Sequence, residues 1–242
     1  MNHSIEIKHL TKQYKGGITA LLDINLTIDG GVFGLLGANG AGKSTLMKVL
    51  STVLTATEGS VKVYGFDTKK QGNEVRRCIG YLPQELTMYP NLSVFDFVSY
   101  MAELKGFRNK NTVMDALEQV DMLTFSKRKI GSLSGGMKRR VGIAQALCGS
   151  PRLLIVDEPT AGLDPEERVR FRNVLSRFAK DGKTVLLSTH IVGDVCQVCR
   201  ELAVLREGKL LYTGSLAGLM GETKTSSLED AYLSLMGGNA HA

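Results

Sequence analysis

The fold of this chain can be predicted from one stretch, Gly37-Ala38-Asn39-Gly40-Ala41-Gly42-Lys43-Ser44-Thr45. It fits the pattern G-x-x-x-x-G-K-[ST], the P-loop, in which a glycine-rich loop holds phosphate groups. The apolar run Val32–Leu36 before it has the character of a buried strand, and an amphipathic helical pattern follows it. A strand that turns through glycines into a helix directs backbone N–H groups to one place. The stretch therefore predicts a nucleoside triphosphate site, with Lys43 on the outer phosphates and Ser44 on Mg²⁺.

Length and composition are those of an ordinary globular protein. The chain has 242 residues, of which 43% are hydrophobic and 22% charged, so it can bury a sizeable core. No segment approaches the roughly 20 apolar residues that span a bilayer. Met1–Leu10 lacks the apolar core of a signal peptide. We therefore expect a cytoplasmic protein that reaches a membrane only through a partner.

The basic charge could suggest a nucleic-acid partner. The formal net charge is +6, and two basic clusters lie at Lys127–Lys129 and Lys138–Arg140. However, tryptophan is absent, aromatic residues are 6% of the chain, and basic and aromatic residues do not alternate. We expect no nucleic-acid partner but a solvated basic face that offsets the charge of bound ATP.

Two of the four cysteines, Cys196 and Cys199, form a C-x-x-C. This spacing occurs in redox pairs and in zinc sites, but no second C-x-x-C or histidine pair accompanies it. Valines at 192, 195 and 198 share the same stretch. We therefore interpret both cysteines as small core residues of a helix.

Apolar runs of strand length recur along the chain, at Ser4–Lys8, Asp23–Ile28, Val32–Leu36, Ser60–Tyr64, Cys78–Leu82, Leu153–Asp157, Thr184–Ser188, Leu202–Leu205 and Lys209–Thr213. The runs near 153 and 184 are continuously apolar, as central parallel strands are. Between about Val94 and Gly149 helical periodicity replaces the strand pattern. The sequence thus predicts an α/β core that a helical insert interrupts.

Two helix starts are well marked. Asp164 is followed by Pro165 and Glu167, which predicts an N-cap, a first-turn proline and a capping box. Ser226 and Glu229 predict a second capping box, which opens a short helix over Leu228–Met236.

The strand Leu153–Val156 ends in two carboxylates, Asp157 and Glu158. In P-loop enzymes such a strand lies beside the P-loop strand, so that Asp157 can reach the Mg²⁺ that Ser44 holds. Glu158 is then placed to orient or deprotonate an attacking water. The alternative is an ordinary acidic turn between a strand and a loop.

A further motif, Leu133-Ser134-Gly135-Gly136-Met137, identifies the family that the chain resembles. With the P-loop and the Asp157–Glu158 pair before and after it, the chain is similar to ABC ATPases, the nucleotide-binding domains of ATP-binding cassette proteins. Their signature is LSGGQ, and here methionine stands at the last position. A serine hydroxyl and two glycine amides at a helix N-terminus form a cradle for the γ-phosphate. Those groups are present, and only the polar contact of a glutamine is missing.

The resemblance implies roles for more residues. In the family an aromatic residue at the place of Tyr14 stacks on adenine, and the Q-loop glutamine, here Gln84, touches Mg²⁺ and opens the helical insert. Asp164 ends the D-loop Ala161–Asp164 along a dimer interface, and His190 matches the switch histidine on the γ-phosphate. The implied catalytic residues are Glu158, His190 and Gln84, and the implied metal ligands are Ser44, Gln84 and Asp157. The implied ATP-binding residues are Tyr14, Gly37, Ala38, Asn39, Gly40, Ala41, Gly42, Lys43, Ser44 and Thr45. The implied signature residues are Leu133, Ser134, Gly135, Gly136 and Met137.

The resemblance also implies an architecture. It is an α/β P-loop NTPase core whose mixed sheet is flanked by helices, with an antiparallel β subdomain and an inserted helical subdomain at about 85–149. We expect residues 1–242 to form one ABC ATP-binding domain with a short C-terminal helix at about 227–236.

In this family two chains enclose two ATP molecules between the P-loop of one and the signature of the other. The chain therefore resembles the ATPase subunit of a membrane transporter, peripheral on the cytoplasmic face, with a second ATPase subunit and a permease that docks at about Glu85–Leu104. Export is favoured, because the chain ends soon after the core and Leu133–Val141 and Leu228–Leu233 are similar to bacterial drug and antibiotic exporters. A compact importer and a soluble ABC ATPase without a transport role are the alternatives.

Overall fold

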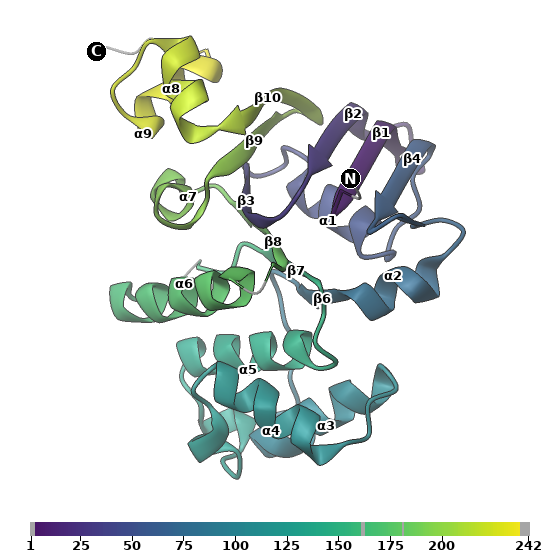
Figure 1. The fold of residues 1–242 in the computed structure, drawn as a ribbon, viewed down its shortest axis with the longest axis vertical. Helices are drawn as coiled ribbons and strands as arrows, with labels where there is room; N and C mark the ends of the chain where they lie inside the picture. Colours follow the sequence, from purple (N-terminus) through teal and green to yellow (C-terminus); the bar gives the residue numbers. More distant parts are fainter. Residues whose placement is uncertain (1–2, 161–162, 181, 238–242) are drawn as a thin grey trace.

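An antiparallel sheet lies on the N-terminal side of the molecule (Figure 1). The computed structural model describes residues 3–160, 163–180 and 182–237. The four strands of this sheet are, in spatial order, β2 (Thr19–Ile28), β1 (Ile5–Gln13), β4 (Glu58–Val63) and β5 (Phe66–Asp67). One face of the sheet is buried, since Ile5, Ile7 and Leu10 of β1 are at most 2% exposed.

A second sheet of six strands is mixed. Its spatial order is β10 (Lys209–Ser215), β9 (Glu201–Arg206), β3 (Gly31–Leu36), β8 (Thr184–Thr189), β7 (Leu153–Asp157) and β6 (Ile79–Leu82). Only β10 is antiparallel to its neighbour; the other pairs are parallel. In the register, Leu36 pairs with Thr189 and Asp157 with Ser188. The loops that follow β3, β7 and β8 therefore leave the sheet at one edge.

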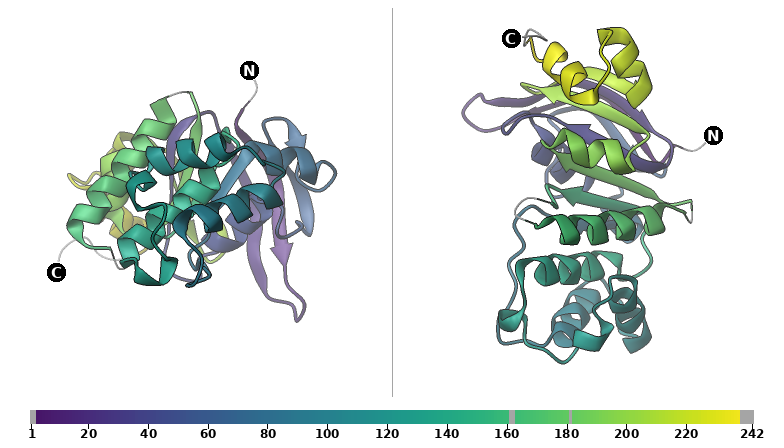
Figure 2. Two further views of the ribbon diagram at one scale, coloured as in Figure 1. Left: turned by 90° about the horizontal axis from the view of Figure 1, so that it is seen from below. Right: turned by 90° about the vertical axis from the view of Figure 1, so that its left-hand side faces the viewer.

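Helices cover both sides of the second sheet and form a separate layer beyond it (Figure 2). They are α1 (Lys43–Leu50), α2 (Gly72–Cys78), α3 (Val94–Leu104), α4 (Lys110–Gln119), α5 (Gly135–Leu147), α6 (Pro165–Lys180), α7 (Val192–Val198), α8 (Leu216–Thr223) and α9 (Leu228–Leu235), with 3₁₀ turns at Leu123–Phe125 and Ile130–Ser132. The outer layer consists of α3, α4 and α5, which connect β6 to β7. Among the described helices, none combines the length and the apolar character needed to cross a bilayer.

The core consists of two apolar clusters, one on each face of the six-stranded sheet. Leu153 and Ile155 of β7 belong to the cluster around α1, between the two sheets. Leu154 and Val156 belong to the cluster beneath α5 and α6. Because both faces of β7 are covered, every residue of the strand is buried. The predicted α/β core with a helical insert is confirmed.

All nine predicted strands are present, but β1 and β2 extend well beyond their predicted bounds. β1 continues past Lys8 to Gln13, and β2 already begins at Thr19, before Asp23. Their pairing contains register shifts, and His9 and Asp23 have φ values of 51° and 52°. These bulges interrupt the in–out alternation on which the prediction depends. The strand β5 was not predicted, since two residues carry no periodic signal.

The two predicted helix starts have different outcomes. The backbone N–H of Glu167 donates to Asp164 Oδ1 at 2.8 Å, so Asp164 caps α6 as predicted. The prediction for α9 is wrong by one residue, because its N-cap is Ser227, whose Oγ accepts from the N–H of Asp230 at 3.1 Å. Ser226 with Glu229 and Ser227 with Asp230 have the same spacing of serine and acid, so the sequence does not distinguish the two possible N-caps. The backbone conformation makes Ser227 the cap.

Two interpretations of the sequence require correction. Cys199 is buried at the end of α7, but Cys196 is exposed, so the C-x-x-C does not point into the core as a pair. Residues 127–129 are exposed, as expected of a solvated basic face. Arg140, in contrast, is only 6% exposed and forms an ion pair with Glu167 at 3.3 Å. Consecutive charged residues point to different sides of a helix, so the sequence cluster alone does not show which side chain faces inward.

Candidate functional site

The loop between β3 and α1 is shaped by glycines that no other residue can replace. A Cβ atom on Gly37 would lie 2.4 Å from the carbonyl oxygen of Leu205, and one on Gly42 would lie 2.6 Å from that of Ala20. Gly40 and Gly42 also have positive φ values, 81° and 108°. The backbone therefore turns tightly at the end of β3 and enters α1 with its first N–H groups unpaired within the helix.

A depression of about 260 Å³ lies over this loop. Its walls are formed by Ala20, Asn39, Gly40, Gly42, Lys43, Ser44, Thr45, Gln84 and Glu158. The structure thus brings the P-loop together with Gln84 and Glu158, which are distant in sequence. The segment 133–137 does not contribute to these walls.

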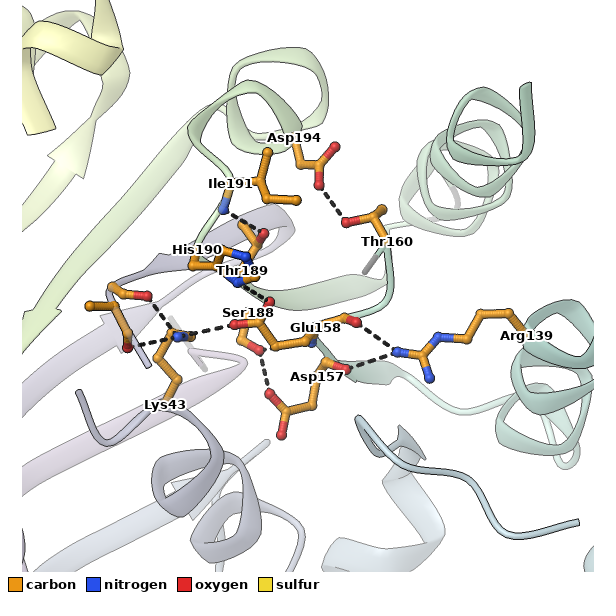
Figure 3. Close-up of polar contacts among 12 residues, drawn as sticks. Lys43, Arg139, Asp157, Glu158, Thr160, Ser188, Thr189, His190, Ile191 and Asp194 are labelled. Atoms are coloured by element: carbon orange, nitrogen blue, oxygen red, sulfur yellow. Dashed lines mark hydrogen bonds and ion pairs between the residues drawn. The ribbon is translucent and has the colours of Figure 1, made fainter. Parts of the chain in front are cut away.

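Lys43 is held by the protein on three sides. Its Nζ donates to the carbonyl oxygens of Gly37 and Ala38 at 2.7 and 3.1 Å and lies 3.1 Å from Glu158 Oε1 (Figure 3). Both side chains of the ion pair are about 4–5% exposed. The ammonium group is therefore compensated internally, and an incoming phosphate would exchange these contacts for its own oxygens.

Glu158 is the centre of the polar network at this edge of the sheet. Its second carboxylate oxygen lies 2.8 Å from His190 Nδ1. Its backbone has a φ of 46°, a left-handed conformation that is rare for a non-glycine residue. Its N–H donates to Ser188, to the carbonyl oxygen at 3.2 Å and to Oγ at 3.1 Å. The loop after β7 is thus fixed to the end of β8.

Asp157 lies deeper than Glu158 and is 2% exposed. Its Oδ1 accepts a hydrogen bond from Ser188 Oγ at 2.5 Å. The hydroxyl of Tyr81 is buried nearby without a hydrogen-bond partner among the described residues. Burial and the neighbouring charge of Asp157 raise the pKa of Tyr81 to about 12. Asp157 is not part of the walls of the depression, although it directly precedes Glu158.

Tyr14 lies beside the start of α1. Its hydroxyl is 3.2 Å from Thr45 Oγ1, and the residue is 37% exposed. Lys12 Nζ lies 5.5 Å from the centroid of the ring. An exposed aromatic face next to the P-loop is consistent with the stacking role predicted from the sequence.

The signature segment forms the N-terminus of α5, in the outer helical layer (Figure 1). Ser134 caps this helix, because its Oγ accepts from the N–H of Met137 at 3.2 Å. Ser134 and Gly135 are exposed, whereas Met137 packs against the apolar core. A Cβ atom on Gly136 would lie 2.6 Å from the side chain of Glu167, so a larger residue here would displace that side chain of α6.

The D-loop lies only partly in the described structure. Ala161 and Gly162 lie outside the described residues, and Asp164 is the cap of α6. Thr160, just before them, is buried, and its hydroxyl donates to Asp194 of α7. Asp194 also lies 4.0 Å from Arg172 of α6.

Ser188, Asp194 and Arg139 are among the residues of this network that were not predicted. Ser188 was interpreted only as a strand residue, although its position just before Thr189 and His190 could have suggested a polar role. Arg139 was assigned to the solvated basic face, but its guanidinium donates to backbone carbonyls at the ends of β6 and β7. No local pattern distinguishes it from its neighbour Lys138.

The oxygen atoms at the depression are of the kind that bind a hard cation such as Mg²⁺. Ser44 and Gln84 supply hydroxyl and amide oxygens at its wall, and Asp157 supplies a carboxylate behind it. Mg²⁺ usually takes few protein ligands together with phosphate oxygens and water. The described residues contain no cluster of three or more histidine, cysteine, aspartate or glutamate side chains that could hold a metal.

The sequence of residues 21–161 matches the family described as ABC transporter. The chain belongs to this ABC transporter family. Its relatives include the ABC transporter ATP-binding protein NatA of Bacillus subtilis, which is 33% identical over 90% of this chain and 90% of its own. The lantibiotic transport ATP-binding protein SrtF of Streptococcus pyogenes is 36% identical over 87% of this chain and 92% of its own.

Solved structures of the ABC transporter family have the same fold. A dimeric ATP-binding cassette bound to ADP and inorganic phosphate, in a post-hydrolysis state, superposes with a TM-score of 0.78 at 28% identity. The match covers 87% of this chain and 98% of that cassette. This ABC transporter chain is therefore an ATP-binding subunit and an ATPase, of a kind that dimerises and partners with membrane permeases.

Proposed function

We propose that this protein powers an ABC transporter by ATP-dependent dimerisation, with Glu158 as the general base for ATP hydrolysis. One observation carries the proposal: the carboxylate of Glu158 lies between Lys43 Nζ, at 3.1 Å, and His190 Nδ1, at 2.8 Å, at the wall of the depression. A base beside the γ-phosphate must reach a water on its outer side. Of the two carboxylates at the end of β7, Glu158 alone reaches the wall.

The P-loop side binds the nucleotide. Backbone N–H groups from Gly37 to Thr45 and the charge of Lys43 receive the phosphates, and Tyr14 stacks on the adenine ring. Ser44, Gln84 and Asp157 would hold Mg²⁺, which would neutralise charge on the phosphates. His190 contacts the γ-phosphate and orients the Glu158 carboxylate through the bond already present.

The remaining phosphate contacts come from a second chain. Ser134 and the exposed amide of Gly135 lie at a helix N-terminus and away from the depression of their own chain. Placed against the depression of a second copy or a paralogue, they complete the cradle around the γ-phosphate. Asp164 lies along the same interface.

Coupling to transport uses the surface beside Gln84. A groove of about 310 Å³ is lined by Leu86, Met88, Pro90, Ile130, Gly131, Gly135, Lys138 and Arg139. It adjoins the segment of about 85–104 where we expect the permease to dock, on the cytoplasmic face of the membrane. We treat residues 1–242 as one ABC ATP-binding domain, with its helical subdomain at about 85–149 and a C-terminal helix at about 227–236.

We favour an exporter. A relative carries the name of a lantibiotic transport protein, another that of a bacitracin transport protein, and peptide antibiotics are typical cargo of exporters. A compact importer or a soluble ABC ATPase without a transport role would use the same site. Co-purification in detergent separates the last of these, because only a transporter subunit is recovered with a multi-span membrane protein.

The function is tested with Glu158→Gln. The amide cannot accept the proton of the water, so hydrolysis falls by about 10²–10⁴-fold, while ATP binding persists. Because both γ-phosphates stay in place, this variant with ATP elutes from a sizing column at about twice its monomer mass. Adding Ser134→Arg, which fills the signature cradle, returns it to monomer. A variant that hydrolyses ATP at the wild-type rate contradicts the role of Glu158.

A further inference from the structure

Arg139 connects the signature helix to the backbone on both sides of the depression. Its Nη1 donates to the carbonyl oxygen of Gln84 at 2.8 Å. Its Nη2 donates to the carbonyl oxygens of Glu158 at 2.7 Å and Asp157 at 3.2 Å (Figure 3), and its Nε donates to that of Pro159 at 3.0 Å. One side chain thus holds the loop after β6 and the loop after β7 together.

The chemistry of this contact requires a guanidinium group. All of its acceptors are neutral backbone carbonyls, and only the planar fork of arginine presents several donors in fixed directions. Burial lowers the pKa of Arg139, and the charges of Asp157 and Glu158 act in the opposite direction. The side chain therefore stays protonated, and a lysine at this position could serve only part of the set.

The carbonyl of Glu158 belongs to a residue under conformational strain. A non-glycine residue in the left-handed region persists only where its surroundings hold it, at a cost of about 1–3 kcal/mol. For Glu158, with its φ of 46°, Ser188 holds the N–H and Arg139 holds the carbonyl. The direction of the carboxylate toward His190 and the P-loop lysine depends on both anchors.

We propose that Arg139 is a positioning residue for ATP hydrolysis. It keeps the backbone of Glu158 and of Gln84 in the arrangement that hydrolysis needs, and it makes that arrangement depend on the position of α5. Since α5 begins at the signature segment, closure of a second chain on Ser134 is transmitted through Arg139 to the base of the first. The proposal rests on the role of Glu158 proposed above.

The adjacent residue offers a matched control. Arg140 lies on the same helix, is 6% exposed and forms an ion pair with Glu167 of α6, and neither residue lines the depression. Removing either arginine therefore takes one positive charge and one guanidinium from α5, half-buried at Arg139 and buried at Arg140. Of these two arginines, Arg139 alone has hydrogen bonds to the loops that carry Gln84 and Glu158.

The experiment measures steady-state ATP hydrolysis and melting temperature for Arg139→Ala, Arg139→Lys and Arg140→Gln. We expect Arg139→Ala to lower kcat by about 10–100-fold, the size of effect that follows a misplaced catalytic group, with KM for ATP changed less than about threefold. Arg139→Lys retains the charge and part of the contacts, so we expect its kcat to lie between those of the wild type and Arg139→Ala. Arg140→Gln lowers the melting temperature but keeps kcat within about twofold.

A double-mutant cycle with Glu158→Gln identifies the route of the effect. If Arg139 acts through the base, adding Arg139→Ala to Glu158→Gln lowers the residual rate by less than about threefold. A structural role predicts that the two losses multiply, and this outcome overturns the proposal, as does an unchanged kcat in Arg139→Lys. If Arg139→Ala does not fold, Arg139→Lys is used in the same cycle. Wild-type hydrolysis in Glu158→Gln alone would instead refute the role of Glu158.

Discussion

The P-loop side and the signature side of this molecule are built differently. On the P-loop side, Lys43 and Glu158 are about 4% exposed and joined to each other, to loop carbonyls and to His190. On the signature side, Ser134 and Gly135 are exposed, and within the described part of the chain the side chain of Ser134 has only its cap bond to the N–H of Met137. The first region is assembled within one chain, whereas the groups of the second are exposed, as the proposed contact with a second chain requires.

The difference has a consequence for energetics. Changes on the P-loop side disturb buried charges and therefore affect stability together with binding or hydrolysis. Changes on the signature side disturb a solvated helix end, which costs little folding free energy. Variants at the signature should therefore lower hydrolysis without lowering the free energy of unfolding.

The largest effect is expected for Lys43→Ala. The substitution removes the charge aimed at the β- and γ-phosphates and leaves Glu158 without its ion pair, so we expect no measurable binding of ATP by titration calorimetry. Lys48→Ala is the control, because Lys48 lies on the same helix and is exposed. Near-normal ATP turnover in Lys43→Ala would refute the assignment of the whole site.

Ser134→Arg tests the signature side. A bulky charge at the exposed helix end blocks the second chain, so hydrolysis falls by about 10²-fold or more while the Kd for ATP of the monomer stays within about twofold. Ser227→Arg is the matched control. Ser227 caps α9 by the same kind of bond, to Asp230 N–H at 3.1 Å, and its loss costs about 1 kcal/mol without affecting hydrolysis. Equal loss of hydrolysis in both variants contradicts the signature's role.

A smaller effect is expected at Tyr14, at the rim of the P-loop side. Tyr14→Ala should weaken ATP binding by about 1–3 kcal/mol, the range for base–aromatic stacking. Tyr14→Phe should change it less than about threefold, because the hydroxyl bond to Thr45 is 3.2 Å long and partly exposed. If phenylalanine were as harmful as alanine, the hydroxyl and not the ring would be the functional group.

The smallest effect is expected outside both regions, at the C-x-x-C. Burial raises the pKa of Cys199 to about 12 and that of Cys148 to about 11, so both stay protonated and slow to react at pH 8. Cys196 is exposed and should be alkylated first, which mass spectrometry of peptides detects. ATP hydrolysis should be unchanged by this modification, and Cys196→Ala should abolish the first adduct. Fast labelling of Cys199 would contradict the packing of α7.

The sequence by itself determined the elements and the chemistry of each motif. The P-loop, the continuously apolar strand before Asp157 and Glu158, and the cap at Asp164 depend on residues close together in the chain, and local patterns describe them fully. The continuously apolar runs near 153 and 184 predicted central parallel strands, and β7 and β8 confirm this. The prediction that the strand before Asp157 lies beside the P-loop strand is wrong, because β8 lies between β3 and β7.

Only the tertiary structure decided which side chains of these motifs meet. The ion pair of Lys43 with Glu158 and the contact of Arg139 with Gln84, 55 residues away, join segments that no local pattern relates. The same is true of orientation: Lys138, Arg139 and Arg140 are alike in sequence, but the turn of α5 and the loops packed against it assign each a different environment. Periodicity describes one element at a time, whereas contacts between elements depend on the packing of all of them.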